Sequence, residues 1–206
     1  MHSATFATMA TKLVSLGAAA AMVALGMATA APPVRPVPHV DMQRYAGMWY
    51  EVARLPNGLQ ANCVADVTAT YRLLDDGSLK VINRCREGER RFSIAVGRAV
   101  PASGDPSWAR LKLSYQPRWL QWLPASSIDY WVVMLDPDYR YAVVSEPSRG
   151  SLWILSRTPT MDSAMYDGIV ARLRAQRYPV DELVPTPQLQ PLRHPPVVAA
   201  RPRLMV

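Results

Sequence analysis

The chain has 206 residues, half of them hydrophobic, which is enough for one domain of ordinary size with tails at both ends. Its formal net charge is +7, but five of its 23 basic residues lie outside residues 41–184, whereas all 16 acidic residues lie within that range. The domain itself is therefore only mildly basic, which argues against nucleic-acid binding, because that function needs basic residues concentrated on one face.

Residues 1–30 have the pattern of a secretory signal peptide. Lys12 precedes an apolar stretch at 13–27, and Ala28-Thr29-Ala30 offers a small-x-small cleavage site. The apolar stretch is shorter than the about 20 residues of a membrane-spanning helix, although an uncleaved anchor remains the alternative. No cysteine lies near the cleavage site to receive a lipid. The sequence thus predicts a periplasmic or secreted protein that is soluble after cleavage, with association to the outer membrane surface left open.

Two proline-rich segments flank the predicted domain, which covers residues 41–184. Residues 31–40 are expected to form an extended linker. Residues 185–206 are basic and without periodicity, so we expect a disordered tail.

Between residues 48 and 157, apolar, aromatic and β-branched runs alternate with turn residues, which is typical of strands. Asp76-Gly77 can supply the positive φ of a tight hairpin. Eight strands joined as a meander are expected to close into an all-β fold, an eight-stranded antiparallel up-and-down β-barrel that can hold one small ligand. The strands are placed near residues 48–55, 64–73, 78–86, 91–99, 109–116, 129–135, 141–146 and 151–157.

One C-terminal α-helix is predicted over residues 162–177, with Asp162 as its N-cap. An apolar stripe on one face needs a surface to pack against. Its members are Met165, Ile169, Val170 and Leu173. A short extended segment at 180–184 is expected to follow.

A catalytic set is not evident in the predicted domain. His2, His39 and His194 all lie outside it, so it lacks the side chain best suited to act as a general base near neutral pH. We find neither a cluster of metal-ligating residues nor a glycine-rich phosphate loop. Asp75 and Asp76 are adjacent carboxylates, but their place in a hairpin turn explains them. The sequence therefore predicts a protein that is not an enzyme and has no metal or cofactor.

Three motifs follow one another at the spacing of barrel strands. They are Gly47-Met48-Trp49-Tyr50-Glu51, Asp136-Pro137-Asp138-Tyr139-Arg140-Tyr141-Ala142 and Leu152-Trp153-Ile154-Leu155-Ser156-Arg157-Thr158-Pro159. These motifs resemble the three signatures of the lipocalin family, and the third is similar to the bacterial lipocalin and apolipoprotein D branch. The resemblance implies that the helix packs outside the barrel and that Arg157 stacks on Trp49. Scaffold roles follow for Gly47, Trp49, Asp136, Tyr139 and Arg157.

The resemblance also implies a function. A lipocalin of this branch would bind, and transport or store, a hydrophobic ligand such as a long-chain fatty acid or lysophospholipid for lipid handling in the bacterial envelope. Two alternatives stay open: a lipocalin-fold enzyme of the thiol-dependent isomerase type, and an envelope interaction protein that recruits a partner. The oligomeric state is not predicted.

Cys63 and Cys85 are the only cysteines, and both lie near the same end of the second and third predicted strands. An even pair in an exported protein favours a disulfide, and two odd-numbered positions can share a face. The alternative is a reactive thiol that faces the cavity.

Connections in a meander alternate between the two ends of the barrel. The three motifs gather at one end, which is the closed end in lipocalins, so the mouth should lie at loops 57–63, 87–90, 117–128 and 147–150. The longest of these contains Arg118, Trp119, Leu120, Trp122 and Leu123. Either this loop folds inward and caps the barrel, or it contacts a membrane interface, which tryptophan favours.

For the cavity wall, the resemblance to apolipoprotein D points to Tyr71, Asn83 and Trp153. Strand alternation adds Ala69, Val81, Leu113, Tyr115 and Tyr130. Such a lining of aromatic and aliphatic groups with a few polar atoms suits an acyl chain. Arginines toward the mouth either meet an acidic head group or form a solvated rim; they are Arg54, Arg84, Arg86 and Arg91.

Overall fold

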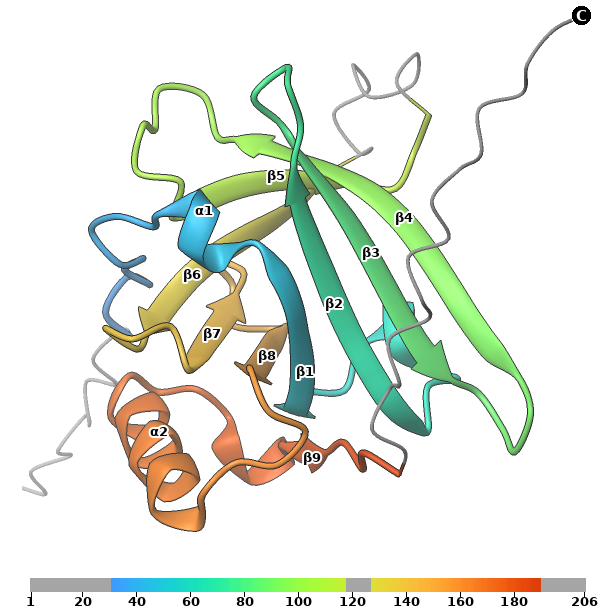
Figure 1. Cartoon of the computed structure of the whole chain (residues 1–206). Coiled ribbons are helices and arrows are strands. Elements are labelled where there is room, and N and C mark those ends of the chain that lie inside the picture. The colour runs from blue at the N-terminus through green and yellow to red at the C-terminus, as the bar shows by residue number, and fades with distance from the viewer. Residues whose placement is uncertain (1–30, 118–126, 190–206) are drawn as a thin grey trace, which may run out of the picture. The chain divides into compact units, whose positions relative to one another are not determined.

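The computed structural model describes residues 31–117 and 127–189, which fold around one antiparallel sheet (Figure 1). Eight consecutive strands form the predicted meander, and the first pairs with both the second and the eighth, which closes the barrel. A ninth strand pairs with the C-terminal end of the first, beyond the residues that pair with the second. The strands are β1 (Gly47–Arg54), β2 (Ala65–Leu73), β3 (Leu79–Arg86), β4 (Phe92–Pro101), β5 (Arg110–Ser114), β6 (Ile128–Leu135), β7 (Tyr141–Ser145), β8 (Leu152–Ser156) and β9 (Val184–Pro185).

An irregularity in β1 lets this strand serve two cores. Its pairing with β8 shifts register between Glu51 and Ala53. Trp49 and Glu51 consequently face the barrel interior, whereas Val52 and Ala53 both pack in the second core outside the barrel. A β-bulge has this effect because the extra residue reverses the alternation of side chains.

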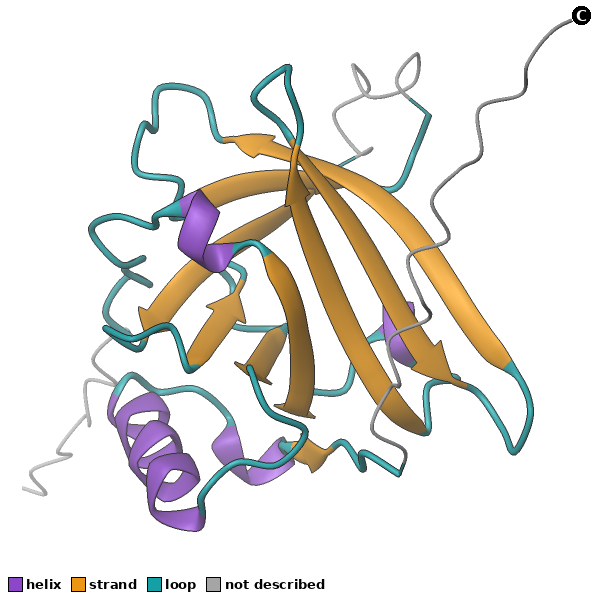
Figure 2. Cartoon of the chain, in the orientation of Figure 1, coloured by secondary structure: helices purple, strands orange, loops and turns teal. Residues whose placement is uncertain are grey.

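The second core lies between the barrel wall and α2 (Ser163–Ala175), which is drawn beside the barrel in Figure 2. Asp162 caps this helix by accepting a 3.0 Å hydrogen bond from the Met165 amide. Ile169 and Leu173 are fully buried, and Met165 and Val170 pack against the same core. The predicted outer helix, its cap and its apolar stripe are therefore confirmed.

The closed end of the barrel is plugged by α1 (Met42–Tyr45) and by Trp49. The Trp49 Nε1 donates to the Tyr45 carbonyl at 2.8 Å, and the Arg157 guanidinium lies 3.8 Å from the centroid of the Trp49 ring. Gly47 sits at φ +95°, where a Cβ would also come within 3.3 Å of Arg157 Nη1, so glycine is required there. The stacking that the resemblance implies is thus present.

The second motif forms the turn before β7 at this same end. Asp136 accepts hydrogen bonds from both Nε and Nη2 of Arg140 at 2.9 Å, and the Arg140 guanidinium lowers the pKa of the Asp136 carboxyl. The Tyr139 hydroxyl accepts a 2.9 Å bond from the Asp41 amide, which ties this turn to the start of α1.

Residues 31–40 differ from the predicted linker because they pack on the barrel. Val40 is fully buried in the barrel core, and its amide donates to the Ser107 carbonyl at 2.8 Å. The Val37 amide donates to the Val132 carbonyl at 2.8 Å, and Val34 is buried in the outer core. The segment is extended as expected, but its valines find apolar neighbours that composition does not reveal.

The folded domain also extends further toward the C-terminus than predicted. Residues 180–182 form a 3₁₀ turn, in place of the expected extended segment. The predicted onset of disorder at Pro185 is wrong for residues 185–189, because β9 pairs with β1 and the Thr186 amide donates to the Val52 carbonyl at 2.9 Å. The rest of the predicted tail lies outside the described residues.

Candidate ligand-binding site

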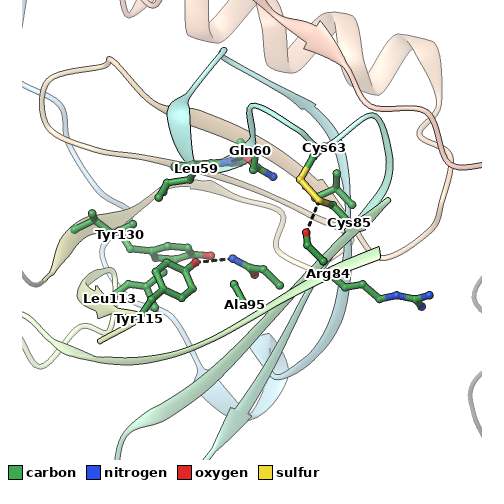
Figure 3. A pocket seen from close by; sticks show the side chains of 14 residues that line it. Leu59, Gln60, Cys63, Arg84, Cys85, Ala95, Leu113, Tyr115 and Tyr130 are labelled. Carbon is green, nitrogen blue, oxygen red and sulfur yellow. Dashed lines mark hydrogen bonds between the residues drawn. A yellow bond between two sulfur atoms is a disulfide. The ribbon is translucent and has the colours of Figure 1, made fainter. Parts of the chain in front are cut away.

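A cavity of about 260 Å³ opens between the loop before β2 and the inner faces of β3 to β6 (Figure 3). Most of its wall is apolar, and its volume lies near the lower edge of the roughly 300–1,000 Å³ range of small-molecule sites. The lining residues are Leu59, Gln60, Cys63, Val67, Asn83, Arg84, Cys85, Ser93, Ala95, Leu113, Tyr115, Ile128, Tyr130 and Trp153.

A second hollow of about 40 Å³ shares five of these residues and is more polar. Glu51, Thr68 and Tyr71 contribute to it, and it is large enough for a water molecule or a small ligand group. Its full lining is Glu51, Gln60, Val67, Thr68, Ala69, Tyr71, Asn83, Tyr130, Val144, Trp153 and Leu155.

The structure brings seven of the eight predicted wall residues to these two hollows. Ala69 and Tyr71 line the smaller one, and the larger one is lined by Asn83, Leu113, Tyr115, Tyr130 and Trp153. Val81 lines neither. It faces inward as predicted, but it pairs with Tyr71 and Gly97 further toward the closed end, where packed side chains fill the barrel.

Three tyrosines form the floor below the cavity. The Tyr130 hydroxyl lies 2.7 Å from both the Tyr45 and the Tyr71 hydroxyls, so all three are hydrogen-bonded in a chain. Burial raises the pKa of each of these phenols well above its usual value, so they stay neutral. The floor is thus uncharged, and its hydroxyls are satisfied by one another.

Glu51 is a buried carboxylate beside the cavity, only 2% exposed. Its Oε1 accepts from Arg54 Nη1 at 2.9 Å and from the Thr186 hydroxyl at 2.5 Å, and its Oε2 accepts from Gln60 Nε2 at 2.6 Å. The Gln60 Oε1 in turn accepts from Trp153 Nε1 at 2.6 Å. One carboxylate therefore fixes the loop at the mouth, a wall tryptophan and the C-terminal segment.

A disulfide between Cys63 and Cys85 joins the same loop to β3, with the two Cα atoms 5.6 Å apart. The predicted disulfide is confirmed. Because both cysteines of the chain are in this bond, the hypothesis of a reactive thiol is wrong.

The arginines toward the mouth do not present charge to the cavity. Arg54 is paired with Glu51, and Arg86 with the buried Asp66 at 2.7 Å. Arg84 lies 4.1 Å from the centroid of the Phe92 ring, and Figure 3 shows its side chain pointing away from the cavity. Even-numbered positions on β3 face outward, so alternation itself contradicts a head-group role for Arg84 and Arg86. Arg91 is exposed and pairs with Glu87 at 3.0 Å, as in a solvated rim.

Comparison with known proteins tests the resemblance directly. Residues 40–188 match the family model of the lipocalin-like domain. The chain belongs to the lipocalin family.

Among its relatives, temperature-induced lipocalin-1 from Arabidopsis thaliana is 38% identical over 72% of this chain and 80% of its own length. Outer membrane lipoprotein Blc from Escherichia coli K12 is 35% identical over 81% of this chain and 91% of its own. Apolipoprotein D from Bos taurus is 26% identical over 77% and 81%. Lipocalins bind small hydrophobic ligands, and an eight-stranded barrel can hold one such molecule inside.

Sequence reasoning missed several lining residues of this lipocalin. Ser93 and Ala95 alternate inward on β4 and could have been found by the rule that placed Leu113. Leu59 and Gln60 lie in the short 3₁₀ helix η1 (Gly58–Gln60) between β1 and β2, for which strand alternation gives no signal. The loop residues predicted at the mouth, Arg118, Trp119, Leu120, Trp122 and Leu123, lie outside the described residues.

The arrangement is suited to holding a molecule. Within residues 31–117 and 127–189, no group of three or more His, Cys, Asp or Glu residues is placed to hold a metal ion. Across the same residues, no helix is both long and apolar enough to cross a membrane.

Proposed function

We propose that this lipocalin binds one molecule with a single acyl chain, a long-chain fatty acid or a lysophospholipid, and carries or stores it without chemical conversion. The observation that carries the proposal is the small, mostly apolar cavity above an uncharged tyrosine floor. Burial of a chain there stabilises the complex by about 0.8 kcal/mol per CH₂ before the entropic costs of association. The small volume favours one chain over two.

The proposed location is the bacterial envelope. The relative from E. coli is described as an outer membrane lipoprotein, and residues 1–30 of this chain have the pattern of a secretory signal. The cysteines of this chain, at 63 and 85, are both far from Ala30 and are bonded to each other. We therefore propose export to the periplasm or the exterior as a soluble protein after cleavage.

Native mass spectrometry of protein purified from its own periplasm without detergent tests the ligand proposal. We expect one acyl lipid per chain, which extraction then identifies. Ala95→Phe should reduce occupancy because Ala95 lines the cavity, whereas Val96→Phe on the opposite face of β4 should not. An empty barrel that also fails to take up fatty acid or lysophospholipid in titration would refute the proposal.

We also propose peripheral contact with an anionic lipid surface through the outer face of β3 and β4. Neither strand contains an acidic residue, and Ile94 and Val96 are 64% and 52% exposed. Register places Ile94 opposite Arg84 and Val96 opposite Ile82. An exposed apolar patch beside cations matches the interface of a bilayer that contains anionic lipid.

Sedimentation with vesicles tests this contact. Vesicles of phosphatidylglycerol and phosphatidylcholine should retain the protein at low salt, and vesicles of phosphatidylcholine alone should retain less. Ile94→Asp should abolish retention, and Val184→Asp, at an exposed apolar position on β9, should not. Equal retention of the two variants would contradict a role for this face.

A further inference from the structure

We infer that the cavity recognises an uncharged group that both donates and accepts a hydrogen bond, such as a hydroxyl, and that Asn83 and Tyr115 bind it. The inference rests on the proposed binding of a single-chain lipid, and within that proposal it favours the lysophospholipid, whose glycerol carries a free hydroxyl, over the ionised fatty acid.

The first observation is an incomplete hydrogen-bond pair inside the cavity. Asn83 Nδ2 donates to the Tyr115 hydroxyl at 2.6 Å, which is the dashed bond that ends on the labelled Tyr115 in Figure 3. The Asn83 Oδ1 is buried, yet no group of the described residues donates to it. A buried acceptor without a donor is unfavourable, so this atom is suited to a donor that the ligand brings.

Tyr115 supplies the complementary donor. Its oxygen accepts the bond from Asn83, which leaves its own proton to be donated elsewhere. Burial raises the pKa of Tyr115 to about 12, so the hydroxyl keeps that proton at physiological pH. An acceptor on β3 and a donor at the end of β5 thus lie side by side and match the two hydrogen-bonding roles of one hydroxyl group.

The charges of the site disfavour a carboxylate at this level. Among the described lining residues, only Glu51 and Arg84 are charged. Glu51 is negative and held by Arg54, and the Arg84 side chain points away from the cavity onto Phe92. An ionised carboxylate beside Asn83 would lose its water without gaining a cation, which is costly. A hydroxyl or a protonated carboxyl carries no such cost.

Asn83 also lies at the junction of the two hollows, since it lines both, together with Gln60 and Trp153. The side chains near the Tyr115 hydroxyl include the apolar Ala95 and Leu113 (Figure 3). The amide and the phenol are thus a polar spot in an apolar wall, which is how small-molecule sites fix the orientation of a ligand.

Competition against diphenylhexatriene, a hydrocarbon fluorophore, tests the inference with three ligands that have the same straight chain up to the polar group: 1-dodecanol, its methyl ether and dodecanoate, all at pH 8. The wild type should bind the alcohol about tenfold more tightly than the ether, which cannot donate to Asn83 Oδ1. Dodecanoate should bind at least about tenfold more weakly than the alcohol.

Two variants assign the preference to its residues. Asn83→Leu should bring the ratio of alcohol to ether affinity close to one while retaining the fluorophore. Tyr115→Phe should weaken the alcohol and the ether by a similar factor, because both accept from the phenol. Ile82→Leu, on the outward face of β3, is the matched control and should change neither ratio. Circular dichroism melts verify that each variant is folded.

Failure of the inference is distinct from failure of the proposed function. If the fluorophore and the alcohol bind but the alcohol-to-ether ratio is near one in the wild type, water satisfies Asn83 and the inference is wrong, whereas hydrophobic binding stands. The inference is also wrong if Asn83→Leu leaves the alcohol-to-ether affinity ratio at its wild-type value. If the fluorophore does not bind and none of the three compounds binds, both the proposed ligand-binding function and the inference are wrong.

Discussion

Replacement of Glu51 should be the most damaging single change at the mouth of the barrel. The side chain is 2% exposed and accepts charge-assisted or neutral hydrogen bonds from Arg54, Gln60 and Thr186. Removal of one partner from a buried ion pair costs about 3–5 kcal/mol, because the other charge is left without a counter-ion. Glu51→Ala should therefore lower the free energy of unfolding by about that amount.

Urea unfolding with the disulfide intact measures this loss. Arg54→Ala in the Glu51→Ala background should recover part of it, since the uncompensated guanidinium is then removed, and a double-mutant cycle isolates that coupling. Glu87→Ala is the matched control: it pairs with Arg91, whose side chain is 72% exposed, and the pair should contribute less than about 1 kcal/mol.

Ligand affinity supplies a second readout for Glu51. Gln60 and Trp153 both line the cavity, and Glu51 orients Gln60, which accepts from Trp153. We therefore expect weaker binding in Glu51→Ala at temperatures where the variant remains folded. A loss of stability below about 1 kcal/mol, or a double variant as unstable as the sum of the single ones, would refute the picture of one carboxylate that fixes three segments.

Three further changes have defined outcomes. Replacement of both cysteines by serine should lower the free energy of unfolding by about 3 kcal/mol, because the Cys63–Cys85 bond joins residues with a sequence separation of 22. A urea-unfolding midpoint, an m-value and a ligand affinity equal to those of the wild type would contradict this prediction. Gly47→Ala should lower the free energy of unfolding, measured by thermal unfolding, by about 1–3 kcal/mol, because Gly47 has φ +95° and Arg157 lies close to it. An unchanged stability would mean that the backbone at the start of β1 can change its conformation without cost. Hydrogen bonds, from Ser107 first and then Arg110, lower the pKa of Asp105 to about 2, and Arg140 lowers that of Asp136. Because these folded-state pKa values lie below the unfolded ones, the stability that they contribute is present above pH 4 and is lost as pH falls toward 2, so Asp105→Asn should flatten the acid limb of a pH–stability curve.

The sequence predicted the parts of this protein that depend on local patterns. Alternation and turn residues were sufficient for eight strands and for the inward direction of Tyr115, and the cap at Asp162 located the helix. The resemblance to apolipoprotein D, and not alternation, pointed to Asn83. The closed end followed from the three motifs, because each of them contributes residues to a single contact network around Trp49 and Asp41.

The unpredicted parts depend on contacts between distant segments. The Gln60 side chain is held in the site by Glu51 and Trp153, which are distant in the sequence, and nothing in the residues around position 60 signals those bonds. Thr186 and Gln188 sit in a stretch whose composition resembles a disordered tail, but each finds a hydrogen-bond partner on β1. Amino-acid composition indicates only the average tendency of a segment to be disordered, whereas a few specific hydrogen bonds hold residues 185–189 on the barrel.

The pattern of β1 explains why the cavity is short. Trp49 plugs the barrel from this strand, and Glu51, two residues nearer the mouth, already belongs to the lining of the hollow. The Tyr130 hydroxyl bonds to the hydroxyls of both Tyr71 and Tyr45, so no hydroxyl of the floor needs a partner from a ligand. A chain that enters from the mouth therefore ends on a surface with no unmet polar group, and the unmet acceptor lies above it at Asn83. This order, with the satisfied floor below and the unsatisfied amide above, favours a ligand whose polar group is held at Asn83 and whose apolar chain fills the larger hollow.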